Sequence, residues 1–145
     1  MKKIPKYPST KQKASHEQKP KVPQKIAVSF ADLTTNKDYN FDYFSGSDLK
    51  GKLKAFEQFT AFLQRLTSQT RLDISKKSKK DDCGLETIDL KFLKFKPNVS
   101  LGSDTKIDVF RFGNGKYRLI GFFEKEQDNV LKILGFDFDY SAYEH

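Results

Sequence analysis

The sequence predicts an α+β domain in which a mostly antiparallel sheet packs against one main helix, behind a disordered N-terminal tail. Three observations support this fold class. Residues 1–25 are basic and rich in proline, apolar residues recur at helical spacing over about 48–67, and the last 39 residues alternate apolar and polar positions between turn signals. A helix followed by a run of strands is typical of an α+β fold.

The N-terminal tail carries most of the net charge. Residues 1–25 contain four of the five prolines and eight lysines against one glutamate. Such a segment cannot bury enough apolar surface to offset its ordering entropy, so we expect it to be disordered. Residues 26–145, the predicted domain, contain nineteen lysines and arginines against eighteen acids. The tail is therefore either a solvating leader or a polycation that adds salt-sensitive affinity for nucleic acid.

The first half of the domain is predicted to hold one strand and one helix. The apolar run 25–33 predicts the strand, and residues 34–46 predict a loop with room for a short strand. Ser47 or Asp48 is predicted to cap the helix, because either side chain accepts a hydrogen bond from a free helical N–H. The apolar positions of the helix predict core packing against the sheet: Leu49, Leu53, Phe56, Phe59 or Thr60, Phe62, Leu63 and Leu66.

A charged connection follows the helix over residues 71–84. Two interpretations of its basic cluster stay open, a solvated loop and a loop that contacts nucleic-acid phosphates. Lys116, in a later turn, is a further candidate for nucleic-acid binding. The lysines of the cluster are Lys76, Lys77, Lys79 and Lys80.

Four strands are predicted in the second half. The first covers about 86–96, where Pro97-Asn98 ends it, and the meander runs over 105–112, 116–124 and 130–138. Asn114-Gly115 predicts a type I′ hairpin turn, since both residues tolerate positive φ. That turn sets Arg111 opposite Arg118.

Like charges directly opposite each other destabilise a sheet. We therefore expect an anion beside the Arg111–Arg118 pair, either a phosphate or a carboxylate of Asp137 or Asp139. These two aspartates share a strand face, which would also suit an acid–base pair or a metal, although neutralising nearby cations is the simpler role.

Several classes of protein are excluded by composition. No run of about 18 apolar residues could span a membrane, and no apolar signal-peptide core is present. The single cysteine, Cys83, cannot form an intramolecular disulfide and is consistent with a reducing cytoplasm. His16 and His145 are the two histidines, so no histidine cluster can hold zinc. We expect no metal, no small-molecule cofactor and no membrane partner.

The remaining residues whose side chains could take part in a reaction predict a site for metal-independent RNA cleavage. Two guanidiniums can bind one phosphate, and tyrosine or histidine side chains near the chain end can transfer protons or stack on bases. In the alternative interpretation, the arginines are edge charges paired with acids and the tyrosines anchor the C-terminus. The candidate catalytic residues are Arg111, Arg118, Tyr140, Tyr143 and His145.

The segment from residue 107 onward, which contains VFRFG…KYRLIGFFE…VLKILGFDFDYSAYEH, resembles the C-terminal half of the RelE/ParE-type toxin superfamily. It is similar above all to small uncharacterised RelE-like proteins of low-GC bacteria and mobile elements. The matching positions are Arg111, Tyr117, Arg118 and Tyr143. The resemblance implies an mRNA-cleaving endoribonuclease of a toxin–antitoxin or defence module, one that leaves a cyclic phosphate. It also implies a cognate antitoxin and RNA, free or ribosome-bound, as partners.

Two other functions are compatible with the same scaffold. One is a non-catalytic module that binds nucleic acid or protein. The other is an inhibitor of DNA gyrase of the ParE kind, which would leave RNA intact.

Overall fold

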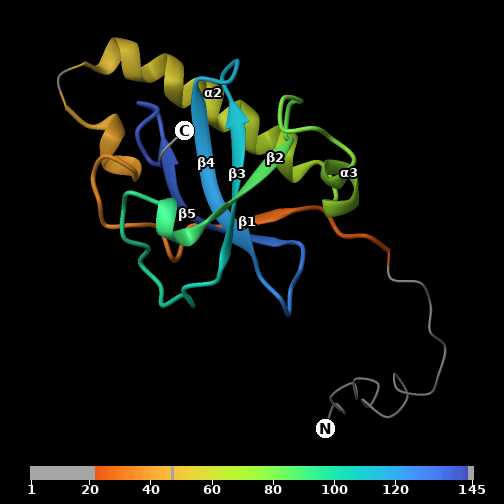
Figure 1. Ribbon diagram of the computed structural model, residues 1–145. Coiled ribbons are helices and arrows are strands. Elements are labelled where there is room, and N and C mark those ends of the chain that lie inside the picture. Colours follow the sequence, from red (N-terminus) through yellow and green to blue (C-terminus); the bar gives the residue numbers. More distant parts are fainter. Residues whose placement is uncertain (1–21, 47, 144–145) are drawn as a thin grey trace, which may run out of the picture.

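The computed structural model describes residues 22–46 and 48–143 (Figure 1). Most of the predicted tail, Ser47 and His145 lie outside these ranges, so the predictions made for them stay predictions. Along the chain the elements are β1 (Ala27–Ser29), η1 (Phe41–Phe44), α2 (Leu49–Thr67), α3 (Arg71–Ser75), β2 (Leu85–Asp89), η2 (Leu90–Phe92), β3 (Lys106–Phe112), β4 (Tyr117–Phe123) and β5 (Val130–Asp137).

A five-stranded sheet with the order β1-β5-β4-β3-β2 forms the centre of the molecule. β1 runs parallel to β5, and the other neighbours are antiparallel. Helix α2 lies across one face of the sheet, while η2 and the C-terminal segment lie on the other side (Figure 1). The predicted α+β class and the C-terminal meander are confirmed, the latter with strand ends shifted by one residue at most.

Alternating strand residues build a core under α2. Phe59 and Phe62 of the helix contact aromatic rings of the strands, with ring centroids 4.9 Å apart for Phe59–Phe136 and 5.0 Å for Phe62–Phe112. Each fully buried phenylalanine stabilises the fold by about 1.5–3 kcal/mol. The phenylalanine-rich composition therefore fills the space between helix and sheet.

The opposite face of the sheet carries a second, smaller core. Val109 and Ile120 of the strands are covered there by Phe95, Ala142 and other residues from loops and the C-terminal segment. This covering brings the end of the chain back over β3 and β4, and with it Tyr143.

The predicted core stripe of the helix is only half correct. Leu49, Leu53 and Phe56 have exposed fractions of 65%, 57% and 41%, whereas Phe59 and Leu66 are buried. The N-terminal half of α2 begins beyond the sheet (Figure 1), so the apolar residues there have no strand beneath them. The predicted cap is confirmed, because the Asp48 carboxylate accepts a hydrogen bond from the N–H of Gly51.

The strand predicted over 86–96 ends early. β2 stops at Asp89, which pairs with Lys106, the first residue of β3. Beyond that pair no neighbouring strand is available, and the chain turns into η2 so that Phe95 can reach the second core.

Three further predictions in the first half need correction. The strand predicted over 25–33 is reduced to β1, and the loop 34–46 holds η1 in place of a short strand. The connection 71–84 contains α3, which the sequence reasoning missed. Its N-terminus is a capping box, with reciprocal hydrogen bonds between Thr70 and Asp73. Lys25, assigned to the tail, is bound into the domain, since its Nζ donates to the Ser68 carbonyl.

Candidate functional site

The β3–β4 hairpin has the predicted register. Arg111 pairs with Arg118 and Phe112 with Tyr117, and Asn114 and Gly115 have positive φ values of 57° and 82°. On the next strand, Asp137 lies opposite Arg118. One of the two carboxylates predicted to offset the arginine pair is therefore its neighbour in the sheet.

Arg118 lies in the interior, with an exposed fraction of 1%. Its Nη1 donates to the carbonyls of Gly115, at 2.6 Å, and Tyr117, at 3.1 Å. Its Nε donates to the Tyr143 hydroxyl at 3.3 Å, and its guanidinium lies 4.9 Å from the ring centre of Tyr140. Arg118 thus ties the hairpin to the C-terminal segment and does not face solvent.

Asp137 organises the chain reversal that follows β5. Its carboxylate accepts hydrogen bonds from the backbone N–H groups of Asp139, Ser141 and Ala142, at 3.1, 3.1 and 2.9 Å. These three donors satisfy the oxygens of a carboxylate that is fully buried. These hydrogen bonds hold the chain reversal that places Tyr143 over the sheet, and the acid–base and metal roles considered for Asp137 stay predictions.

Glu86, which the sequence reasoning missed, lies at the centre of the polar network. Its Oε1 accepts a hydrogen bond from Arg111 Nη2 at 3.1 Å and from the Tyr143 hydroxyl at 2.9 Å. Lys79 Nζ lies 3.9 Å from Oε2. The side chains of Arg111 and Glu86 are 29% and 21% exposed, so this part of the network reaches the surface.

The network changes the pKa values of its members. Burial raises the pKa of Glu86, but the hydrogen bonds from Tyr143 and Arg111, with the charges of Arg111 and Lys79, outweigh it and leave that pKa lowered. Burial is the main reason that the pKa of Tyr143 is raised, and its bond to Glu86 adds to the effect. At neutral pH, Glu86 is an anion and Tyr143 a neutral donor.

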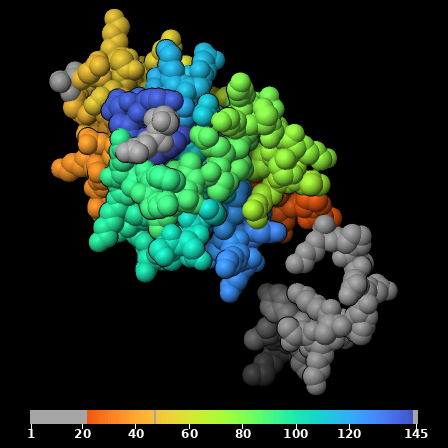
Figure 2. Space-filling model, viewed as in Figure 1, coloured from red at the N-terminus to blue at the C-terminus, as the bar shows by residue number. Residues whose placement is uncertain are grey.

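The structure thus brings together four of the five candidate catalytic residues: Arg111, Arg118, Tyr140 and Tyr143. Tyr143 is 4% exposed and Tyr140 is half exposed, at 50%. His145 lies outside the described residues. Figure 2 shows the C-terminal segment, in dark blue, packed beside the lighter blue hairpin on the face opposite α2.

A cleft of 690 Å³ adjoins this network at the end of β3, where Arg111 and Phe112 extend past the last residue paired with β2. It lies between α2, the turn at residues 80–82 and the hairpin tip. Its charges are balanced, with three cationic and three acidic side chains: Arg65, Lys80, Arg111, Glu57, Asp81 and Asp82. Arg111 belongs to both features, since it lines the cleft and also binds Glu86.

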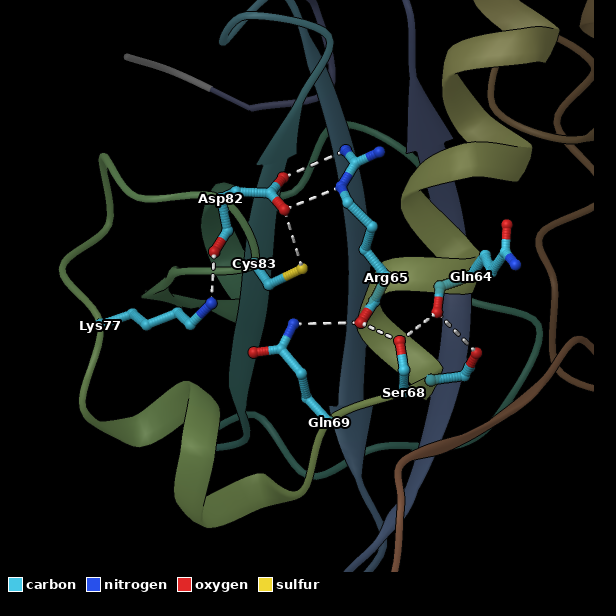
Figure 3. Close-up of polar contacts among 8 residues, drawn as sticks. Gln64, Arg65, Ser68, Gln69, Lys77, Asp82 and Cys83 are labelled. Atoms are coloured by element: carbon cyan, nitrogen blue, oxygen red, sulfur yellow. Dashed lines mark hydrogen bonds and ion pairs between the residues drawn. The ribbon is translucent and has the colours of Figure 1, made fainter.

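Polar contacts fix one wall of the cleft (Figure 3). Arg65 donates to both Asp82 carboxylate oxygens, at 2.8 and 3.1 Å, and Lys77 Nζ donates to the Asp82 carbonyl at 3.2 Å. The buried Cys83 thiol lies beside the same carboxylate, at 3.6 Å. Burial, followed by the charge of Asp82, raises the pKa of Cys83 to about 11, so the thiol is not activated.

The predicted lysine cluster divides into groups with different surroundings. Lys77 and Lys79 contact Asp82 and Glu86, as described above, and Lys76 is the C-cap of α3. Lys80 lines the cleft, and Lys116 is exposed in the hairpin turn. The best-placed candidate for a phosphate contact at the cleft is Lys80.

Comparison with known proteins gives no assignment: no family model, no curated protein and no solved structure matches the chain. Within residues 22–46 and 48–143, no cluster of three or more histidine, cysteine or acidic residues could hold a metal ion. In the same ranges, no helix is long and apolar enough to cross a bilayer.

Proposed function

We propose that the protein is a metal-independent endoribonuclease in which Glu86 is the general base and Arg111 binds the scissile phosphate. The observation that carries the proposal is the shared oxygen Glu86 Oε1, which accepts hydrogen bonds from Arg111 and Tyr143 at the surface end of the network. An ionised carboxylate beside a guanidinium combines a proton acceptor with a phosphate-binding group in one place. The proposed substrate is RNA, so its proposed site of action is the cytoplasm.

In the proposed reaction, Glu86 takes the proton from a ribose 2′-hydroxyl. The 2′-oxygen then bonds to the neighbouring phosphorus, the bond from phosphorus to the 5′-oxygen breaks, and that oxygen takes a proton from water. The products are a 2′,3′-cyclic phosphate and a 5′-hydroxyl. Arg111 and Lys79 lie where they can stabilise the negative charge that builds up on the phosphate.

Binding of RNA would also make Glu86 a more effective general base. The pKa of Glu86 is lowered in the free protein partly by its hydrogen bond to Arg111. A phosphate that takes over Arg111 removes this bond and brings negative charge close to the carboxylate. Both changes raise the pKa of Glu86 toward neutral pH, where a general base is most effective.

Arg118 and Tyr143 are positioning residues in this proposal. Both are almost fully buried, and Tyr143 holds Glu86 while Arg118 holds Tyr143. The proposal therefore differs from the sequence interpretation, which gave Arg118 direct contact with phosphate and gave Tyr143 or His145 a role in proton transfer or base stacking.

The test is RNA cleavage in the presence of EDTA, followed by analysis of the product ends. We expect wild type to yield cyclic phosphate ends and Glu86→Gln and Arg111→Ala to lose at least about 100-fold in rate, the lower range for a general base. Matched controls are Asp89→Asn and Lys106→Ala, which break the other carboxylate–cation pair between β2 and β3. Equal losses in all four variants, or no cleavage by wild type, would contradict the proposal.

A second candidate function is protein binding through the N-terminal half of α2. Leu49, Leu53 and Phe56 line a groove of 420 Å³ together with Phe44 and Lys52. Exposed apolar residues gathered in one place mark interaction sites. An apolar groove with a lysine at its side fits an amphipathic partner segment with acidic flanks, and the antitoxin implied by the resemblance would be a partner of this kind.

This second function can be tested independently of RNA. An acidic amphipathic peptide should bind wild type, as measured by calorimetry, and a lysine-flanked version of it should not. Leu53→Glu should abolish binding, whereas Leu72→Glu should not, although both leucines are 57% exposed. Self-association of the protein in place of peptide binding would show that a second copy covers the groove.

A further inference from the structure

Tyr140 is held at the surface in a backbone conformation that tyrosine rarely adopts. Its φ is 60°, in the left-handed region that favours glycine and asparagine. The Asp137 carboxylate fixes this conformation, since it accepts hydrogen bonds from the backbone N–H groups of Asp139 and Ser141 on either side. Strained residues persist only where the surrounding structure determines them, and they gather at functional sites. The strain therefore indicates a function for the side chain that this backbone presents.

The Tyr140 ring is fixed from the interior and exposed on the outside. The Arg118 guanidinium lies 4.9 Å from the ring centre, and Arg118 is only 1% exposed, so it approaches the ring from within the protein. A cation over one face holds an aromatic ring by electrostatic attraction. Half of the surface of Tyr140 stays in contact with solvent. An exposed, fixed aromatic ring is the kind of surface on which nucleobases stack.

This ring lies on the same face of the sheet as the proposed ribonuclease site. Arg118 stands opposite Arg111 on one neighbouring strand and opposite Asp137 on the other, so the three side chains share one face. Two further contacts lead from Arg118 to the proposed base. Its Nε is 3.3 Å from the Tyr143 hydroxyl, and that hydroxyl is 2.9 Å from Glu86 Oε1. A short stretch of RNA on this face can therefore contact both the ring and Glu86.

We propose that Tyr140 is a stacking platform for an unpaired nucleobase of the RNA substrate, a proposal that rests on the ribonuclease function proposed above. Stacking uses the face of a base, which every base has, so the platform accepts any sequence. In a duplex the bases are already stacked on one another, so the platform selects single strands. The exposed neighbour Asp139 repels a phosphate but not an uncharged base. The ring would thus fix one nucleotide near the phosphate bound by Arg111.

The test follows stacking separately from cleavage. A short single-stranded oligouridine carries one 2-aminopurine, a fluorescent base that stacking quenches, at each position in turn. It is added to full-length Glu86→Gln protein in EDTA, and we expect quenching on binding. Tyr140→Phe keeps the ring and should keep both the quenching and the affinity. Tyr140→Gly should lose the quenching and weaken binding at least about 5-fold, the lower end for the loss of one stacked base.

The choice of glycine separates binding from folding. Glycine adopts positive φ without strain, so we expect Tyr140→Gly to stay folded, which thermal unfolding checks. Tyr140→Asn, which also tolerates this φ, is a second variant without the ring. The basic N-terminal segment is present in every variant, so differences between variants report on the folded domain.

Phe92 provides a matched control. It is 45% exposed, and Lys91 Nζ lies 5.2 Å from its ring centre, so it too is an exposed aromatic ring beside a cation. It belongs to η2, on the same side of the sheet as the C-terminal segment (Figure 1), but it follows the end of β2 that is farther from Glu86. Phe92→Ala should leave the quenching and the affinity unchanged.

Several results would overturn the platform: no quenching at any position, an equal loss with Phe92→Ala, or a loss with Tyr140→Phe as large as with Tyr140→Gly. Cleavage by wild type judges the ribonuclease function on its own. An inactive wild type with quenching that depends on the Tyr140 ring would support the platform and overturn the ribonuclease. An active wild type without such quenching would overturn the platform alone.

Discussion

Two carboxylate–cation pairs join β2 to β3. They have the same chemistry but differ in their exposure to solvent and in the residues around them. Asp89 and Lys106 form a pair at one end of the ladder, with side chains 36% and 65% exposed. Glu86 and Arg111 form the other, less exposed pair, which is also bound to Tyr143 and borders the cleft. An exposed pair on its own contributes little, whereas a pair built into a buried network holds its groups in fixed positions.

Position in the fold, more than residue type, marks the candidate site. Both pairs would look alike in a list of charged residues. Only the Glu86–Arg111 pair is connected to the two core residues, Arg118 and Tyr143, that fasten the end of the chain to the sheet. Substitutions along this connection should therefore have effects that decrease from the buried end to the exposed pair.

The largest effect is expected at the buried end. Arg118→Ala removes the donor of three hydrogen bonds and leaves the carbonyls of Gly115 and Tyr117 without it. Removing one charged member of a buried network lowers the unfolding free energy by about 3–5 kcal/mol. Urea unfolding followed by circular dichroism measures this loss, and a change below about 1 kcal/mol, the range of exposed pairs, would place Arg118 outside the network.

A smaller loss is expected one step nearer the surface. Tyr143→Phe keeps the ring but removes the hydroxyl that accepts from Arg118 and donates to Glu86. We expect a loss of about 1–3 kcal/mol, since a buried charged donor is left partly unsatisfied. The pKa of Glu86 should rise in the same variant, because one of the hydrogen bonds that lower it is gone. Carbon-13 NMR titration of the Glu86 carboxyl group would detect this rise, and an unchanged pKa would rule out the contact.

A still smaller effect on stability is expected at the Glu86–Arg111 pair, and it should depend on pH. Folding lowers the pKa of Glu86 from its ordinary value of 4.5. Its contribution is therefore complete above that pH and is lost as the pH falls through the lower folded-state value. Glu86→Gln should cost about 1 kcal/mol at neutral pH and progressively less in acid.

The other pair gives the control for that pH dependence. Folding also lowers the pKa of Asp89, chiefly through its hydrogen bond to Lys106, so the sign is the same. Because that pair is exposed, Asp89→Asn should change the unfolding free energy less than Glu86→Gln at neutral pH, and the difference should shrink in acid. Unfolding curves at a series of pH values measure both variants, and equal curves would remove the distinction between the two pairs.

What the sequence predicted well depends on local chemistry. The Asn114-Gly115 turn determines the facing of Arg111 and Arg118 because the turn alone sets the hairpin register. Asp48 likewise caps α2 through contacts within one helical turn. Glu86 was missed because its role depends on the pairing of β2 with β3, which lie far apart along the chain. Once that pairing is known, Glu86 stands opposite Val109 on the same face as Arg111.

The remaining errors concern which partner an apolar residue finds. Helical spacing identified the stripe of α2, but it cannot show that the sheet ends before Leu49 and Leu53 are covered. The apolar run after Asp89 has the composition of a strand, yet it turns away because β3 begins at Lys106 and offers no further pairing.

The most direct test of the proposed ribonuclease function is induced expression in a bacterial host with RNA integrity followed over minutes. It compares wild type with Glu86→Gln and with the matched Asp89→Asn. We predict rapid RNA loss and growth arrest with wild type and Asp89→Asn, and intact RNA with Glu86→Gln at equal protein levels. Intact RNA and normal growth with all three would contradict the ribonuclease and leave protein binding through α2 as the better-supported function.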